Sequence, residues 1–549
     1  NIDTQPVDGV PSEAEPNVSV DVSDTVAGQG AKDAKDTDIM AVAKSNVRAF
    51  ILCRLVFSAR FYYPVFLLVF QDFGLSVAEF SWLNALWSVV IILLEVPSGA
   101  MADVIGRKKL VVYAFVCMAF EMLVPIMVPL SAPKTLILAA FSLNRILSGT
   151  AEAAMSGADE ALVYDSLQAA GIASTWADVL KRVGQSKSLL VVVTSTLGSL
   201  TYDPDVWNAV CRWTGIGRGE WTKADTVRIP LGLNFITALI GLWSASRMVE
   251  SGHMAEGGAE GETETAPADT ERQSEAAPPT DTTETETSDA DGTHPIRAAF
   301  SQALSTGSWI LTCRPLYLVM LAATVLNHAA RFLVTINARY MVAIGYPEGS
   351  LGVISSITGL LGIPTAALSL RMTRTMRPGP AFLLTSLVTV VAMGLLSLFI
   401  PWYGVLVSML QYVSCLLPMP IVSVATHSLT KDPTQRATVV SFQSLLSMCG
   451  YGLACVVYSL VFDSDTEEGL RGSYAWFGPY QIMATLAVVL VVGVCLRKER
   501  REGGSELATF MAEVISKAPE TPKSDTKTDT DGCTDTIEAS GETHADDQV

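Results

Sequence analysis

Charged side chains, histidines and recognisable catalytic motifs are all scarce in this chain of 549 residues. Only 17% of the residues are charged, against about 25% in an average globular protein. The five histidines have no metal-ligand spacing, the nine cysteines include no Cys-x-x-Cys pair, and no Gly-x4-Gly-Lys-Ser/Thr phosphate loop occurs. These absences exclude an ordinary soluble enzyme, a disulfide scaffold and a self-contained ATPase. We therefore expect no enzymatic activity, no cofactor and no metal.

Negative charge is abundant but confined to three stretches. Residues 1–47, 250–296 and 497–549 hold 35 acidic and 11 basic residues, whereas the other 402 residues hold 20 acidic and 26 basic ones. The three stretches carry few large apolar side chains and cannot form a core. We expect a disordered N-terminal tail, a disordered linker and lead-in over 250–313, and a C-terminal tail. In that last tail, 506–517 is either a short amphipathic helix or a frayed segment.

Long apolar runs fill the rest of the chain. A helix needs about 20 apolar residues to cross a bilayer, and six such stretches lie on each side of the acidic insert. The sequence therefore predicts an all-α membrane protein with 12 transmembrane helices in two six-helix bundles, over 48–249 and 314–496. The expected spans are 48–70, 80–102, 109–130, 134–157, 187–203, 227–247, 314–338, 348–370, 380–400, 402–428, 436–462 and 474–496.

Basic residues decide the orientation of these spans. If the termini are cytoplasmic, the short inner segments carry 15 Lys and Arg, and the short outer loops carry only three. Basic residues near span ends stay on the cytoplasmic side. We therefore expect a multi-pass protein of the cell membrane with both termini in the cytoplasm.

The most specific motif lies between the second and third spans. It reads Gly99-Ala-Met-Ala-Asp103-Val-Ile-Gly106-Arg107-Lys108-Lys109. Gly99 would let a neighbouring helix approach closely, Asp103 would accept hydrogen bonds one turn later, and Gly106 would permit the turn. We expect Asp103 to lock the hairpin to the next bundle near Arg436. A plain cytoplasmic loop would explain Arg107 and Lys108, but not Gly99 and Asp103.

This hairpin resembles the signature loop of the major facilitator superfamily, whose plan of six spans, a linker and six spans also matches. The run Arg145-x-x-Ser148-Gly149 in the fourth span is similar to the second motif of the family. The stretches Glu95–Gly99 and Ser156–Asp165 and the start Arg436-Ala-Thr of span eleven resemble a bacterial-type branch of undefined substrate. Two departures matter. The hairpin of the second half lacks the Gly and Asp, and the fifth span lacks the Gly-Pro antiporter motif.

Seven ionisable residues lie inside the expected spans, where each is costly and thus a functional candidate. They are the substrate or proton site candidates Arg60, Glu95, Glu121, Arg145, Glu152, His328 and Arg331. The resemblance implies that spans one, four, seven and ten line a central cavity, which would place the three arginines and His328 there, with Glu152 and Gln411. Structural alternatives remain for several of them. Three residues near the inner surface, Arg54, Glu95 and Glu152, could form structural ion pairs. Arg145 could pair with Glu95 or Glu121, and His328 could donate to a carbonyl in the core.

These features predict a secondary transporter that moves a small solute by alternating access. A surplus of buried arginines favours an anionic substrate held by Arg60, Arg145 and Arg331. Coupling to protons would use one of the three buried carboxylates. The expected partners are a small-molecule substrate, the lipid bilayer and protons, with no nucleic acid, and the protein is expected to be a monomer. The alternatives are a multidrug-type efflux transporter and, in a different class, a non-transporting membrane sensor or scaffold, or a lipid scramblase.

Overall fold

The computed structural model describes residues 22–215, 220–250, 307–308, 310, 313–376, 378–429, 433–462 and 465–501. Within these ranges every regular element is a helix or a short 3-10 turn. Ten helical segments are long and apolar enough to cross a membrane. Two further long helices, α5 (Lys134–Met155) and α7 (Trp176–Tyr202), are more polar and stand where the fourth and fifth spans are expected. The fold class predicted from the sequence is confirmed.

The first bundle contains six membrane-spanning segments and three shorter helices. The spanning segments are α1 (Val22–Ser58) continued by η1 (Tyr63–Val65) and α2 (Phe66–Asp72), then α3 (Val77–Ile105), α4 (Arg107–Met127), α5, α7 and α10 (Ile229–Ser246). The shorter helices are α6 (Ala158–Ala169) between α5 and α7, and α8 (Pro204–Thr214) and α9 (Lys223–Thr226) between α7 and α10.

The second bundle repeats the plan, and two of its spans are divided. Its elements are α13 (Arg314–Ala343), η3 (Glu348–Ser350), α14 (Leu351–Leu360), α15 (Gly362–Thr375), α16 (Pro378–Leu396), α17 (Gly404–Leu416), α18 (Pro418–Leu429), α19 (Pro433–Val461) and α20 (Glu467–Arg501). The break between α17 and α18 falls directly before Pro418, where a proline cannot supply the helical N–H.

The first span is broken rather than continuous over 48–70. Pro64 explains the break, because its ring clashes with the carbonyl four residues earlier in a helix and it lacks an N–H. The exposed backbone is held by neighbouring helices. The N–H of Phe61 donates to Asn234 Oδ1 on α10 at 2.6 Å. Gly198 of α7 packs so closely that a Cβ there would lie 1.7 Å from the Phe61 carbonyl oxygen.

The acidic tails are described only in part. Helix α1 begins at Val22, so residues 22–47 are helical where the sequence predicted disorder. The predictions for most of the 250–313 linker and for the 506–517 helix concern segments outside the described residues.

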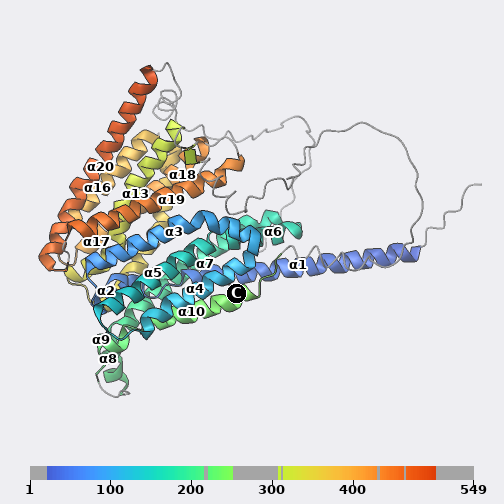
Figure 1. Ribbon diagram of the computed structural model, residues 1–549, viewed down its shortest axis with the longest axis horizontal. Helices are drawn as coiled ribbons and strands as arrows, with labels where there is room; N and C mark the ends of the chain where they lie inside the picture. The colour runs from blue at the N-terminus through green and yellow to red at the C-terminus, as the bar shows by residue number, and fades with distance from the viewer. Residues whose placement is uncertain are drawn as a thin grey trace, which may run out of the picture.

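The two bundles converge at one end and separate at the other (Figure 1). They meet along two helix pairs, α3 with α19 and α7 with α14. The closed end carries α8, α9 and η3, and the open end carries α6 and α18.

Candidate functional site

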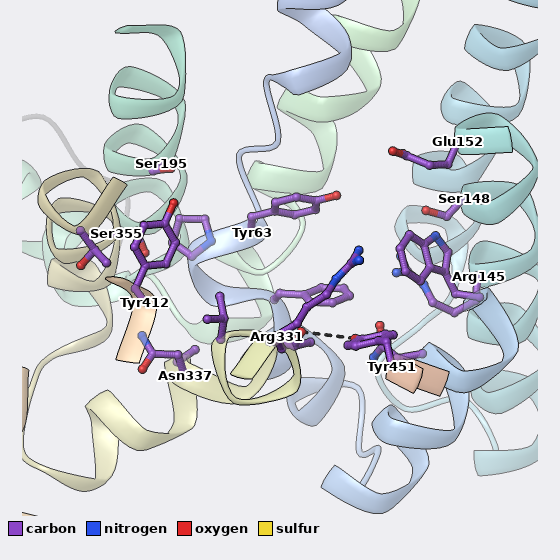
Figure 2. A pocket seen from close by; sticks show the side chains of 18 residues that line it. Tyr63, Arg145, Ser148, Glu152, Ser195, Arg331, Asn337, Ser355, Tyr412 and Tyr451 are labelled. Carbon is purple, nitrogen blue, oxygen red and sulfur yellow. Dashed lines mark hydrogen bonds between the residues drawn. The ribbon is translucent and has the colours of Figure 1, made fainter. Parts of the chain in front are cut away.

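A cavity of 340 Å³ lies between the bundles, beside the break in the first span. Aromatic rings form much of its wall, and its charged side chains are Arg145, Glu152 and Arg331. Figure 2 shows Arg331 reaching into the middle, with Arg145, Ser148 and Glu152 along α5 on one side and Tyr412 and Ser355 on the other. The aromatic residues of the wall are Tyr63, Phe66, Trp87, Tyr412 and Tyr451.

A second cavity of 350 Å³ shares Trp87, Glu152 and Arg331 with the first. Its other charged residues are Arg54, Glu95 and Glu160. Because Glu160 belongs to α6, this second cavity leads from the central one toward the open end of the molecule. The path between the bundles is thus lined by both signs of charge.

Arg60, Glu121 and Arg145 form one buried cluster in the first bundle. Glu121 is fully buried, and its two carboxylate oxygens lie 3.1 Å from Arg60 Nη1 and 3.4 Å from Arg145 Nη2. Tyr62 donates its hydroxyl to the same carboxylate at 3.3 Å. One carboxylate therefore pairs with two guanidinium groups, so the cluster keeps a net positive charge. Of the two arginines, Arg145 reaches the central cavity, whereas Arg60 is absent from its wall.

Arg331 of α13 has a different environment. Its guanidinium lies 5.1 Å from the centre of the Tyr451 ring and 5.8 Å from that of Trp87. In the described part of the chain, no carboxylate oxygen comes within 4.0 Å of it. One N–H of Arg331 donates to Met448 Sδ at 3.8 Å. The aromatic faces stabilise the cation, but they leave its other N–H groups available to a ligand in the cavity.

Glu95 and Glu152 line the cavities without forming the ion pairs that the sequence left open. Among the described residues, neither carboxylate has a basic partner within salt-bridge distance. Glu152 is exposed to both cavities. One oxygen of Glu95 is buried without a hydrogen-bond partner, and Ser444 of α19 contacts the same side chain.

His328 packs away from the central cavity. Its Nδ1 lies 2.9 Å from the carbonyl oxygen of Thr324, to which it must donate, and its Nε2 lies 2.5 Å from the Tyr480 hydroxyl of α20. The ring is buried and does not line either central cavity. The structure thus shows the core histidine that the sequence left as the alternative.

The hairpin motif contacts its own bundle. Arg107 forms an ion pair with Asp165 of α6, and the N–H of Lys108 donates to Glu250 Oε1 at 2.8 Å. Gly106 has φ +98°, as the turn requires. A Cβ on Gly99 would touch nothing within 4 Å, so the close helix approach predicted there is absent at this open end. The predicted lock between Asp103 and Arg436 concerns side chains outside the described set.

Helix α6 is also bound to the first span, through two ion pairs of Arg54, a residue for which the sequence predicted an ion pair but not its partners. Arg54 Nε lies 2.5 Å from Asp159 Oδ2, and Arg54 Nη2 lies 2.6 Å from Glu160 Oε1. Burial raises the pKa of Asp159 to about 6, although Arg54 opposes the shift. The signal was present in the Ser156–Asp165 stretch, but spacing could not identify Arg54 as its partner.

The closed end is held by hydrogen bonds between side chains at the C-terminal end of α7 and backbone groups of η3 and α14. Asp203 Oδ2 accepts from the N–H of Gly349 at 2.8 Å, and Ser199 Oγ accepts from the N–H of Gly352 at 2.8 Å. Ser199 in turn donates to the Gly349 carbonyl at 2.9 Å. An ion pair between Lys223 and Glu348 adds to these contacts. Opening this end would require all of them to separate.

The fold is shared with solved transporters, although the sequence matches no protein-family model and no curated protein. The nucleoside transporter NupG has a TM-score of 0.57 at 10% identity, covering 82% of this chain and 98% of that one. A D-xylose-proton symporter has a TM-score of 0.55 at 11% identity, covering 81% of this chain and 96% of that one. A bacterial homologue of the human lysosomal transporter Spinster, in an inward-facing and occupied conformation, has a TM-score of 0.51 at 14% identity. The match covers 82% of this chain and 96% of that one. These structural neighbours are transporters, and this chain shares their fold.

Proposed function

We propose that the protein is a secondary transporter of a small solute that carries an anionic group. The observation that carries this proposal is the cavity between two bundles that separate at one end and touch at the other. Rocking the bundles about this cavity would expose it first to one side of the membrane and then to the other. The structure then corresponds to one of the two end states.

The charge of the cavity supports an anionic cargo. Arg331 meets aromatic faces instead of a carboxylate, and Arg145 shares Glu121 with Arg60. An unpaired buried cation is costly, and a carboxylate or phosphate of the solute would remove that cost in a bidentate geometry. We assign Arg331 as the principal contact and Arg145 as the second. Arg60 would act by sharing Glu121, not by touching the solute.

We propose that the protein lies in the cell membrane and that its open end faces the cytoplasm. The bases that favour this orientation lie at the helix ends there, including Arg107 and Lys108 at the start of α4, and Arg371 and Arg374 in the last turns of α15. The termini would then be cytoplasmic and the state inward-facing. One chain supplies both walls of the cavity, so a monomer would suffice.

Proton coupling would use Glu95 or Glu152, because both carboxylates line the path to the open end. Each could release a proton to the cytoplasm once the cavity opens there. Glu121 is less suited to this role because it is fully buried between two arginines and lines neither cavity.

The direct test is anion binding and exchange by purified protein. Arg331→Gln should lose binding of gluconate and hexanoate by about tenfold or more, because a charge-assisted contact disappears. The matched control is Arg374→Gln, which changes an exposed arginine of α15. Equal anion binding by wild type and Arg331→Gln would refute the assignment.

The orientation has its own test. Reporters inserted at residue 270 and fused to the C-terminus should both report cytoplasm, and one inserted near 466 should report the opposite side. A signal from outside the cytoplasm at 270 would contradict the placement.

The aromatic wall favours efflux of amphipathic compounds as a second candidate. Rings such as Trp87 and Tyr451 can stack on many apolar cargoes. Tight binding of a cationic amphipathic dye that survives in Arg331→Gln, together with no binding of either anion, would favour this second function.

A further inference from the structure

A small side chamber of 30 Å³ lies beside the central cavity, within the second bundle. Val334, Asn337, Thr358 and Tyr412 line both spaces, so the two adjoin. The deeper wall adds Gln411 of α17 and Tyr474 of α20. A solute in the central cavity could therefore extend one end into this chamber.

Two polar side chains in the chamber wall, Gln411 and Tyr474, lack hydrogen-bond partners, and the rest of the wall includes the apolar Leu333, Val334 and Leu396. The Gln411 side chain is 2% exposed, and neither its Oε1 nor its Nε2 has a hydrogen-bond partner. The hydroxyl of Tyr474, also 2% exposed, is likewise unpartnered. Asn337 differs, since its Oδ1 accepts from Ser408 Oγ at 2.7 Å. Buried amides are almost always satisfied in proteins, so these groups indicate that something polar fills the space.

The size and chemistry of the space limit what can fill it. A volume of 30 Å³ accommodates about two water molecules or the two heavy atoms of a hydroxymethyl group. It holds no charged side chain. The amide of Gln411 presents a donor and an acceptor side by side, which complements hydroxyl groups because each hydroxyl both donates and accepts.

We propose that this chamber is a specificity subsite for the hydroxylated end of the solute, so that the substrate class is a hydroxylated carboxylate. Gln411 and Tyr474 bind the hydroxyls in the chamber, while Arg331 binds the anionic group in the central cavity. The anionic half of this inference rests on the proposed function, but the hydroxyl half rests on the chamber alone.

The experiment measures equilibrium binding of three probes to the purified full chain. Gluconate carries a carboxylate and hydroxyls, hexanoate carries the carboxylate alone, and sorbitol carries hydroxyls without charge. Wild type should bind gluconate at least about tenfold more tightly than hexanoate. Gln411→Met, which keeps the length of the side chain, should remove most of that preference without weakening hexanoate. Tyr474→Phe should lose part of the preference for gluconate over hexanoate. The control variant Gln168→Met, on the exposed face of α6, should keep the full preference.

Each other outcome has a definite meaning. Unchanged preference in Gln411→Met together with a higher melting temperature would show that the chamber holds only structural water, which overturns the proposal. No preference for gluconate over hexanoate in wild type would also overturn it, while leaving the anion transporter intact. Sorbitol binding that Gln411→Met abolishes, with no hexanoate binding, would uphold the chamber and reject the anionic function. If Gln411→Met fails to fold, the same comparison in Tyr474→Phe decides.

Discussion

Gly352→Ala tests whether the closed end is held by the direct contact of α14 with α7. A Cβ on Gly352 would lie 1.9 Å from the carbonyl oxygen of Ser195 and 2.3 Å from Ser199 Oγ. One of those atoms belongs to the backbone of α7, so the helices must move apart. The movement would also stretch the hydrogen bond from the Gly352 N–H to Ser199.

The size of the effect follows from these contacts. Overpacking of this kind costs about 1–3 kcal/mol, and a lost hydrogen bond adds about 1 kcal/mol. A shift of about 3 kcal/mol moves a two-state equilibrium by roughly two powers of ten. Because the cost falls only on the state in which this end is closed, the population should move toward the opposite state.

Distances between pairs of spin labels would report this shift. Labels at Asp205 and Pro347, both exposed at the closed end, should move apart, and labels at Gln168 and Thr375 at the open end should approach each other. Gly359→Ala is the matched control, since it changes a glycine of the same helix with nothing within 4 Å. Both substitutions raise helix propensity equally. Identical distance distributions in the two variants would refute the role assigned to Gly352.

Three further predictions concern the first bundle. Burial raises the pKa of Asp159 from 3.8 to about 6, so the folded protein binds a proton that the unfolded chain has released between those values. Stability should therefore fall by roughly 3 kcal/mol as the pH rises through that window, and Asp159→Asn should flatten this part of the melting-temperature profile; an unchanged profile would contradict the shift. Glu121→Gln should destabilise the protein by about 3–5 kcal/mol, because two buried arginines lose their carboxylate, whereas the exposed Glu220→Gln should not; equal melting temperatures would count against the cluster. Gly198→Ala should weaken binding of any solute in a direct assay, since its Cβ would push the Phe61 carbonyl and shift the wall beside Tyr63; unaltered binding would show that the broken segment does not position the site.

Much of the fold could be predicted because a bilayer imposes a minimum length on apolar helices. The expected stretches all correspond to helical segments, including the polar α5 and α7. The break in the first span was missed, although Pro64 was the available signal. Hydropathy alone does not register a proline in an apolar run, and the partner that stabilises the break, Asn234, lies in another helix.

The site was predicted less completely, because depth in the membrane does not specify direction. Arg60, Glu121 and Arg145 were predicted to lie inside three different spans, but their meeting at one carboxylate depends on the rotation of three helices. The same limit applies to His328, which stands one turn from Arg331 on α13 yet packs toward α20. Tyr63 and Tyr451 were missed because an aromatic residue in an apolar span gives no signal of its own.

The interrupted first span has a consequence for how the substrate range of such a protein could change. Tyr63 and Pro64 form part of the cavity wall, but their height in the membrane is set from behind by Asn234 and Gly198. Those two residues are absent from that wall. A substitution at either could therefore reshape the cavity without touching the solute. Variants selected for a new cargo should include changes at Gly198 of α7 and Asn234 of α10, positions that a search restricted to cavity-lining residues would overlook.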